Sequence, residues 1–402
     1  MNKLLLVLFL FFLPIHLQAE NAPNLTQITQ HLQQHPQGFA NLEHQFLGDQ
    51  VTLHLEENQS KQLSLPNGMT LTYGQIVMLA GDLFGDPRYP ISSCEPKQRS
   101  ICFLAQFNAL AQGKDNKGCQ NPLSQTKNLL SYFQNLAQQL VIWKQDGKSE
   151  PDFYKLHATE INKQSNRLTC GGSKVSEYIP FGTYLKLAEV NFDHFSPDSL
   201  KAYEAGHQTA LNTAMQAYQQ KKMGNNKTAQ QLLELAYAQN AFANHFLSDS
   251  FAAGHLRTPR RAISEHIKLP AILQLLLANL MHDEDNRLGV NVVNAAGLSW
   301  KAYGDNYLMQ SQAANHRYIL IEAMQRSADA IYDTFLSGTL PKKYSELELV
   351  PQADKVGQLD QAAALFKMEN GVLLKRKESR NPNNYEWTAK WSPLLTLLEF
   401  SL

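Results

Sequence analysis

The stretch NHFLSDSFAAGHLRTPR, residues 244–260, holds two histidines and an aspartate in a short span. His245 and Asp249 stand four residues apart at the end of a predicted helix, so their side chains leave the same face one turn apart. His255 follows after an Ala-Ala-Gly sequence that allows the chain to curl back. Because this spacing lets helix-borne ligands and a nearby histidine reach one metal ion, we predict that these three residues bind zinc.

The pattern of apolar residues around this stretch is helical. An Asn-rich break at residues 224–226 separates two long segments, and Gly338 is a natural C-cap for a later one. Residues 50–72 are predicted to be extended, and within them a Pro-Asn-Gly turn between two alternating arms, QLSLPNGMTLT at 62–72, predicts a small β-hairpin near the N-terminus. The predicted helices cover residues 72–85, 124–145, 197–220, 227–248, 270–283 and 314–338. The expected fold class is therefore mainly α, a multi-helix bundle.

The first residues and the overall charge bear on the location and partners of the chain. Residues 1–19 have the layout of a secretory signal peptide, which predicts an exported protein, secreted or periplasmic. We expect a helical domain over residues 20–340 and a C-terminal extension of uncertain structure over 341–402. The 36 basic and 36 acidic residues cancel, and without a basic excess no nucleic-acid partner is expected. No obligate protein partner is evident.

The four cysteines form an even set in a chain predicted to be exported. They lie at positions 94, 102, 119 and 170, without the close pairing that zinc-binding cysteines usually show. We therefore predict two disulfides, with the pairing left open.

Further histidines and carboxylates extend the predicted metal site. His207 falls on the buried stripe of its helix, and Asp193 precedes that helix. His194 is adjacent to Asp193 and is expected only to flank the turn. His282 ends the most apolar helix and is followed directly by acidic residues, from which we select Asp285 as a ligand.

The other histidines and a nearby basic cluster have ordinary explanations. A solvated ring is expected for His31, His35, His44 and His54, which lie among polar residues. Arg257, Arg260 and Arg261 could grip a lipid phosphate, but a solvated basic turn is the expectation.

The ligand set points to a reaction class. Histidine and carboxylate without thiolate suit zinc, and the number of candidates exceeds one tetrahedral shell. Two or three ions sharing Asp249 would account for it. Such a site activates water at neutral pH and contacts both oxygens of a phosphoryl displacement, which favours phosphoester hydrolysis.

These motifs resemble those of the bacterial zinc-dependent phospholipase C family. The resemblance spans roughly residues 180–290 and rests on His-x3-Asp-x5-His. It implies an all-helical fold of the phospholipase C and nuclease type around a zinc cluster. It also implies a glycerophospholipid substrate at a membrane or micelle surface, cleaved to diacylglycerol and a phosphorylated head group.

The resemblance also implies roles for individual residues. His207, His245 and Asp249 would bind one zinc ion, with Asp249 bridging to a second, while His255 and His282 would bind another. Asp193 would act on the attacking water, so Asp193 and Asp249 are the expected catalytic residues.

Two departures from the family pattern concern the remaining ligands. Asn286 stands where the family has a carboxylate, so Asp285 or Glu284 would substitute, or Asn286 would bind through its carbonyl. The family's third zinc uses an N-terminal tryptophan, and the first tryptophan here is Trp143. Asp82 is a candidate to fill that gap, or it caps its helix.

Two other functions remain open. One is a zinc-dependent single-strand nuclease, or another phosphoesterase of the same fold. The nuclease shares the fold and spacing, but it typically has Gln-Pro where this chain has Ala253-Gly254. A non-enzymatic, zinc-stabilised binding protein is the other alternative, although structural zinc sites favour cysteine.

Overall fold

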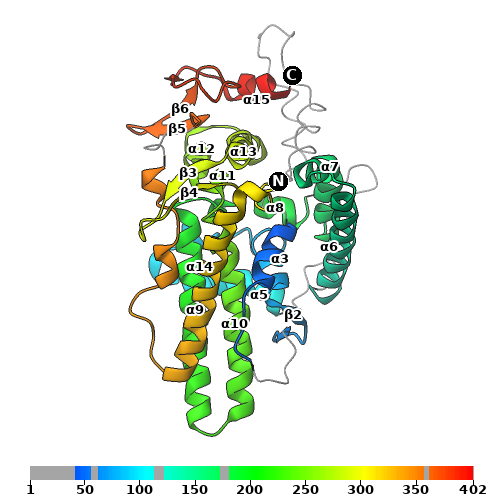
Figure 1. Ribbon diagram of the computed structural model, residues 1–402, viewed down its shortest axis with the longest axis vertical. Coiled ribbons are helices and arrows are strands. Elements are labelled where there is room, and N and C mark those ends of the chain that lie inside the picture. The colour runs from blue at the N-terminus through cyan, green and yellow to red at the C-terminus, as the bar shows by residue number, and fades with distance from the viewer. Residues whose placement is uncertain (1–40, 56–61, 113–121, 173–180, 357–361, 402) are drawn as a thin grey trace, which may run out of the picture.

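The computed structural model describes residues 41–55, 62–112, 122–172, 181–356 and 362–401. Within these ranges the chain is mainly helical with a few short strands (Figure 1), which confirms the expected fold class at that level. The predicted signal peptide, residues 1–19, lies outside the described residues. No helix within them is both long and apolar enough to cross a membrane.

Two long helices form the centre of the molecule. The helices α9 (Asp198–Lys222) and α10 (Asn226–Asp249) run side by side as a hairpin, and α14 (Ala314–Ser337) packs against both (Figure 1). Small residues allow the close approach: a Cβ on Gly206 of α9 would lie 2.6 Å from the Cβ of Ala243 on α10. Every residue of α10 from Ala236 to Asp249 is buried. The helix therefore ends inside the protein, with Asp249 as its last residue.

Shorter helices surround this centre and bring other segments to the end of α10. The helices α3 (Asn41–Asp49) and α4 (Tyr73–Leu79) pack against each other and against α10. On the other side, α11 (Ala253–Arg257) and α12 (Arg260–His266) both pack on α13 (Ala271–Leu288). Three further long helices are α5 (Arg99–Ala111), α6 (Pro122–Gln145) and α7 (Glu150–Leu168). The short helix α8 (Thr183–Glu189) follows them in the chain.

The strands form three small antiparallel sheets. The strands β1 (Gln62–Ser64) and β2 (Thr70–Thr72) pair around the Pro-Asn-Gly turn, which confirms the predicted hairpin. The second hairpin, β3 (Val290–Val293) and β4 (Ser299–Ala302), follows α13 directly. The third sheet has the order β5 (Phe366–Glu369), β6 (Val372–Arg376) and β7 (Trp387–Thr388).

The C-terminal segment, whose structure the sequence left open, packs on the α12–α13 side of the molecule. Its sheet and the final helix α15 (Pro393–Ser401) share a separate apolar cluster with α12 and α13. The guanidinium of Arg376, fully buried, forms two hydrogen bonds to Glu284 of α13, at 2.8 and 2.9 Å. Such a two-point contact fixes the sheet to the helix.

One disulfide joins described residues. Cys94 and Cys102 are bonded to each other across eight residues of sequence. The prediction that cysteines are paired is confirmed for this bridge, while Cys119 lies outside the described residues.

We expect Phe242→Ala to lower the free energy of unfolding by about 3–5 kcal/mol. Phe242 is fully buried and makes edge-on contacts with Phe103 and Phe107 of α5, at 5.8 Å each. The control, Leu156→Ala, changes a side chain that is 66% exposed and should shift stability by no more than about 0.5 kcal/mol. Urea unfolding measures both, and equal losses would contradict this packing.

Candidate metal centre

The carboxylate of Asp249 lies at the centre of a buried histidine cluster. His245 is one helical turn earlier on α10, with its Nε2 3.4 Å from Asp249 Oδ2. His194 Nδ1 is 2.8 Å from the same oxygen. His255 Nδ1 and His44 Nε2 approach the other oxygen, at 3.2 and 3.5 Å. Four histidine rings from different parts of the chain therefore surround one carboxylate.

The ring of His245 is oriented by the backbone. Its Nδ1 lies 3.0 Å from the carbonyl oxygen of Val77 in α4, so this nitrogen carries the proton and Nε2 presents a lone pair. That Nε2 is 3.2 Å from Nδ1 of His194. Two ring nitrogens aimed at one point beside a carboxylate is the arrangement of ligands that share a cation, with the second nitrogen of His245 fixed by a carbonyl as in known metal sites.

Three groups of side chains, two of which share His245, have ligand atoms close enough to hold a metal ion. In each group these atoms lie within 4.8 Å of one another. The groups are His44, Asp82 and His245; His194, His245 and Asp249; and His255, His282 and Asp305. Because only Nε2 of His245 is available, the first two groups share one ligand atom. Complete sets of three ligands are therefore available for two cations at once: one cation in either of the first two groups and one in the third.

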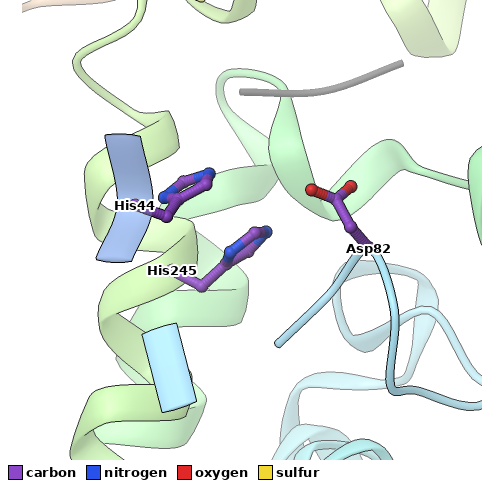
Figure 2. A group of neighbouring side chains, drawn as sticks. All are labelled: His44, Asp82 and His245. Carbon is purple, nitrogen blue, oxygen red and sulfur yellow. The ribbon is translucent and has the colours of Figure 1, made fainter. Parts of the chain in front are cut away.

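The first group joins three segments that are distant in sequence. Figure 2 shows His44 from α3 and His245 from α10 with their rings side by side, and Asp82 facing them from the turn after α4. The centroids of the two rings are 4.3 Å apart. Gly81 makes room for this turn: it has φ +69°, and a Cβ there would lie 2.5 Å from His245 Nε2.

The third group is built on α11, α13 and the loop after β4. His282 Nε2 is 2.8 Å from Asp305 Oδ2, and its Nδ1 is 2.9 Å from Asp283 Oδ1. The ring centroids of His255 and His282 are 4.8 Å apart. Asp283 therefore orients His282 from behind, as carboxylates do for metal-bound histidines.

Three carboxylate oxygens in these groups lack hydrogen-bond donors in the described part of the chain and could instead bind a cation. Asp82 Oδ2, Asp249 Oδ1 and Asp305 Oδ1 are buried, and none receives a hydrogen bond from a residue that the structure describes. Buried acceptors are normally hydrogen-bonded, so these three oxygens are available as ligands. The site can hold divalent metal ions, and its oxygen and nitrogen donors suit several of them.

Burial and charge shift the pKa values of these groups in opposite directions. Burial raises the pKa of Asp82 to about 7. Burial would lower the pKa of His194, but Asp249 and Asp82 raise it to about 9. For His282 the opposing carboxylates Asp305 and Asp283 outweigh burial and raise the pKa to about 10. Burial lowers the pKa of His245 to about 4.

The predicted residues His245, Asp249, His255 and His282 do come together, but His207 does not join them. Its Nδ1 is 2.8 Å from Asn240 Oδ1, and its Nε2 is 3.5 Å from Glu346 Oε1 on the 3-10 helix η5 (Ser345–Glu348). His207 does lie on the buried face of α9, yet that face points to α14 and η5, and His194 stands in its expected place.

The carboxylates next to His282 are held elsewhere. Asp285, the ligand selected from the sequence, pairs with Arg257, whose Nε is 2.9 Å from its Oδ2. Glu284 pairs with Arg376. The carbonyl of Asn286 accepts the Gly254 N–H at 2.7 Å. The carboxylate beside His282 is instead Asp305.

Asp193 is buried near the cluster with both oxygens in use. They accept the backbone N–H groups of Ile91 and Ser92 at 2.6 and 2.8 Å. Burial raises its pKa nevertheless. Asp193 borders a cavity of about 20 Å³ beside His194, which Gly81, Pro90 and Phe246 also line. A cavity of this size has room for about one water molecule.

Sequence reasoning missed His44, His194 and Asp305 as candidate ligands. His44 was expected to be solvated, but it is fully buried, because α3 packs its histidine face against α10. Two signals were available in the sequence: the apolar neighbours of His194 and the Gly-Asp-Asn turn at 304–306.

Comparisons with protein-family models, curated proteins and solved structures found no match to the chain.

We expect Gly81→Ala to weaken metal binding by at least ~10-fold, because the added Cβ displaces His245 and His194. The matched control is Gly147→Ala, at φ +74° with nothing within 4 Å of the added Cβ. Both variants carry the backbone strain of about 1 kcal/mol, but only Gly81→Ala blocks the site. Titration with Co²⁺ compares them, and equal affinities would contradict the placement of the turn at 80–85.

Metal binding should release protons at neutral pH. His194 and His282, with pKa values of about 9 and 10, are protonated in the metal-free protein at pH 7 and must lose a proton to bind. Affinity should therefore rise with pH from 7 towards 9, with about two protons released per protein. Calorimetry in buffers of different protonation enthalpy measures this, and His194→Ala should release one proton fewer. An affinity independent of pH over this range would contradict the prediction.

Proposed function

We propose that this protein is an exported zinc-dependent phosphodiesterase of the phospholipase C type, acting on glycerophospholipids. The observation that supports this most directly is the shared use of Asp249 by the three histidines of two neighbouring ligand groups, His194, His245 and His255. A carboxylate between two groups is placed to bridge two cations, as two-metal phosphoesterases require. Histidine and carboxylate donors without thiolate make zinc the expected metal.

The metal ions, when bound, would supply an activated water and neutralise the charge on the phosphate. The protein's own groups would hold and orient them. Val77 and Asp283 fix the tautomers of His245 and His282. Asp82 is the candidate to accept a proton from the water, because its pKa is about 7 and its Oδ2 lacks a donor among the described residues.

Asp193 has a different part in this proposal from the one expected from the sequence. Its two oxygens already bind the backbone of residues 91 and 92. It would therefore hold the loop of His194 in place, as an orienting group.

The residues around the cavity beside His194 do not suit the backbone of a nucleic acid. Among the described residues that line this cavity are Asp86 and Asp193 but no lysine or arginine, and Pro87, Pro90 and Leu187 are apolar. A nucleic acid would need basic residues along its backbone. With a formal net charge of zero, the chain offers no such excess.

The test is a substrate panel with the purified, zinc-loaded chain. We expect release of phosphorylated head group from phosphatidylcholine vesicles and no cleavage of single-stranded DNA. His245→Ala should lose bound zinc and reduce the rate by more than ~100-fold, or about 2.7 kcal/mol of barrier. The control is His54→Ala, whose ring is half exposed and pairs with Asp329, and which should keep both.

Three results would contradict the proposal. Cleavage of DNA but not lipid would identify a nuclease. Zinc binding without cleavage of either would favour a binding protein. Full activity of His245→Ala would remove the assignment of the site.

A further inference from the structure

Arg260 is one of the most deeply buried charges in the protein, although the sequence suggested a solvated basic turn. Its exposed fraction is 1%. Its Nε donates to Asn191 Oδ1 at 2.8 Å and its Nη2 to the carbonyl of Glu189 at 2.9 Å. Both acceptors belong to the segment that leads from α8 into the 3-10 helix η3 (Phe192–His194).

No carboxylate of the described residues balances this charge. The partly buried Arg257 and the buried Arg376 each pair with an acid. Within the described part of the chain, Arg260 forms no ion pair and its Nη1 has no hydrogen-bond acceptor. An unpaired buried guanidinium is costly, and packing alone would be served better by an apolar side chain. The two hydrogen bonds that Arg260 donates, to Asn191 and Glu189, therefore indicate what its guanidinium does.

Arg260 and its neighbour enclose the turn that carries His194. The guanidinium carbons of Arg260 and Arg261 lie 4.9 and 4.6 Å from the ring centroid of Phe192. Arg261 is anchored in turn by Asp198, whose Oδ2 is 2.5 Å from its Nε. Two flat guanidinium groups thus hold the ring two positions before His194.

The segment that contains Arg260 and Arg261 also contains a candidate metal ligand, His255. His255 lies five residues before Arg260, and its carbonyl accepts the N–H of Ser196 at 2.9 Å, just beyond His194. Residues 255–261 are therefore in contact with the His194 turn on both sides. Since η3 is a short element with few internal hydrogen bonds, these contacts determine where His194 stands relative to Asp249.

We propose that Arg260 is a positioning residue for the metal centre: its guanidinium holds the 189–192 segment so that His194 meets a cation together with Asp249. This rests on the metal binding put forward above, and it does not require that the substrate is a lipid. A lysine cannot replace the fork, because an ammonium group cannot make both planar contacts with the same geometry.

The test compares Arg260→Lys with Arg376→Lys, since each removes the fork of a buried arginine and keeps the charge. Co²⁺ titration of the metal-free proteins, followed by visible absorption, is the readout. We expect Arg260→Lys to weaken one Co²⁺ site by about 10–100-fold, the usual effect of losing an outer contact, and to leave the His255–His282–Asp305 site unchanged. Arg376→Lys should lower thermal stability and keep the affinity of both sites.

A second variant covers the case in which Arg260→Lys does not fold. Asn191→Ala deletes one acceptor and leaves the arginine in place, and it should weaken the same Co²⁺ site. Unchanged affinity in the folded variants, or equal weakening of both sites, would overturn the positioning role, and a wild-type chain that binds no Co²⁺ would overturn it together with the metal centre. Metal binding without phospholipid cleavage would contradict the proposed function alone.

Discussion

The structure depends on a carboxylate that lies at the end of a buried helix. Asp249 has no exposed surface, and burial alone would raise its pKa, but His245, His255 and His194 hold the pKa well below its usual range. The cost of burying an ion is offset only where opposite charge or ligands surround it. Each neighbouring histidine must therefore be held in place by its own segment, and a bound cation would complete the balance.

The rest of the fold supplies those restraints. Small residues let α9 and α10 pack closely, so α10 can end inside the protein with its last turn enclosed. The turn at Gly81 leaves space for two rings, and the Val77 carbonyl sets one tautomer. The acids that follow His282 pair with Arg257 and Arg376, and the hairpin after α13 brings Asp305 to His282 instead.

Sequence patterns predicted features that depend on local spacing, and they did not predict contacts between segments that are distant in the sequence. The spacing of His245 and Asp249 follows from helical periodicity, which is why this pair could be found. The same periodicity found α6, α9, α10, α13 and α14 but missed α5 and α7, and the Pro-Asn-Gly turn found the hairpin at 62–72. His207, which the sequence favoured over His194, lies away from the cluster, because a buried helix face does not say which neighbour it meets. Asp305 is brought to His282 by the β3–β4 hairpin, so this contact depends on tertiary packing, and the turn at 304–306 does not by itself say which residue Asp305 meets.

The most direct test of the metal centre is anomalous diffraction at the zinc edge from crystals of the zinc-loaded chain. We expect two or more strong peaks around Asp249, one near His194 and His245 and one among His255, His282 and Asp305. A zinc peak beside His207 and Glu346 instead, or an empty cluster at saturating zinc, would contradict the central claim that these buried histidines exist to hold metal ions.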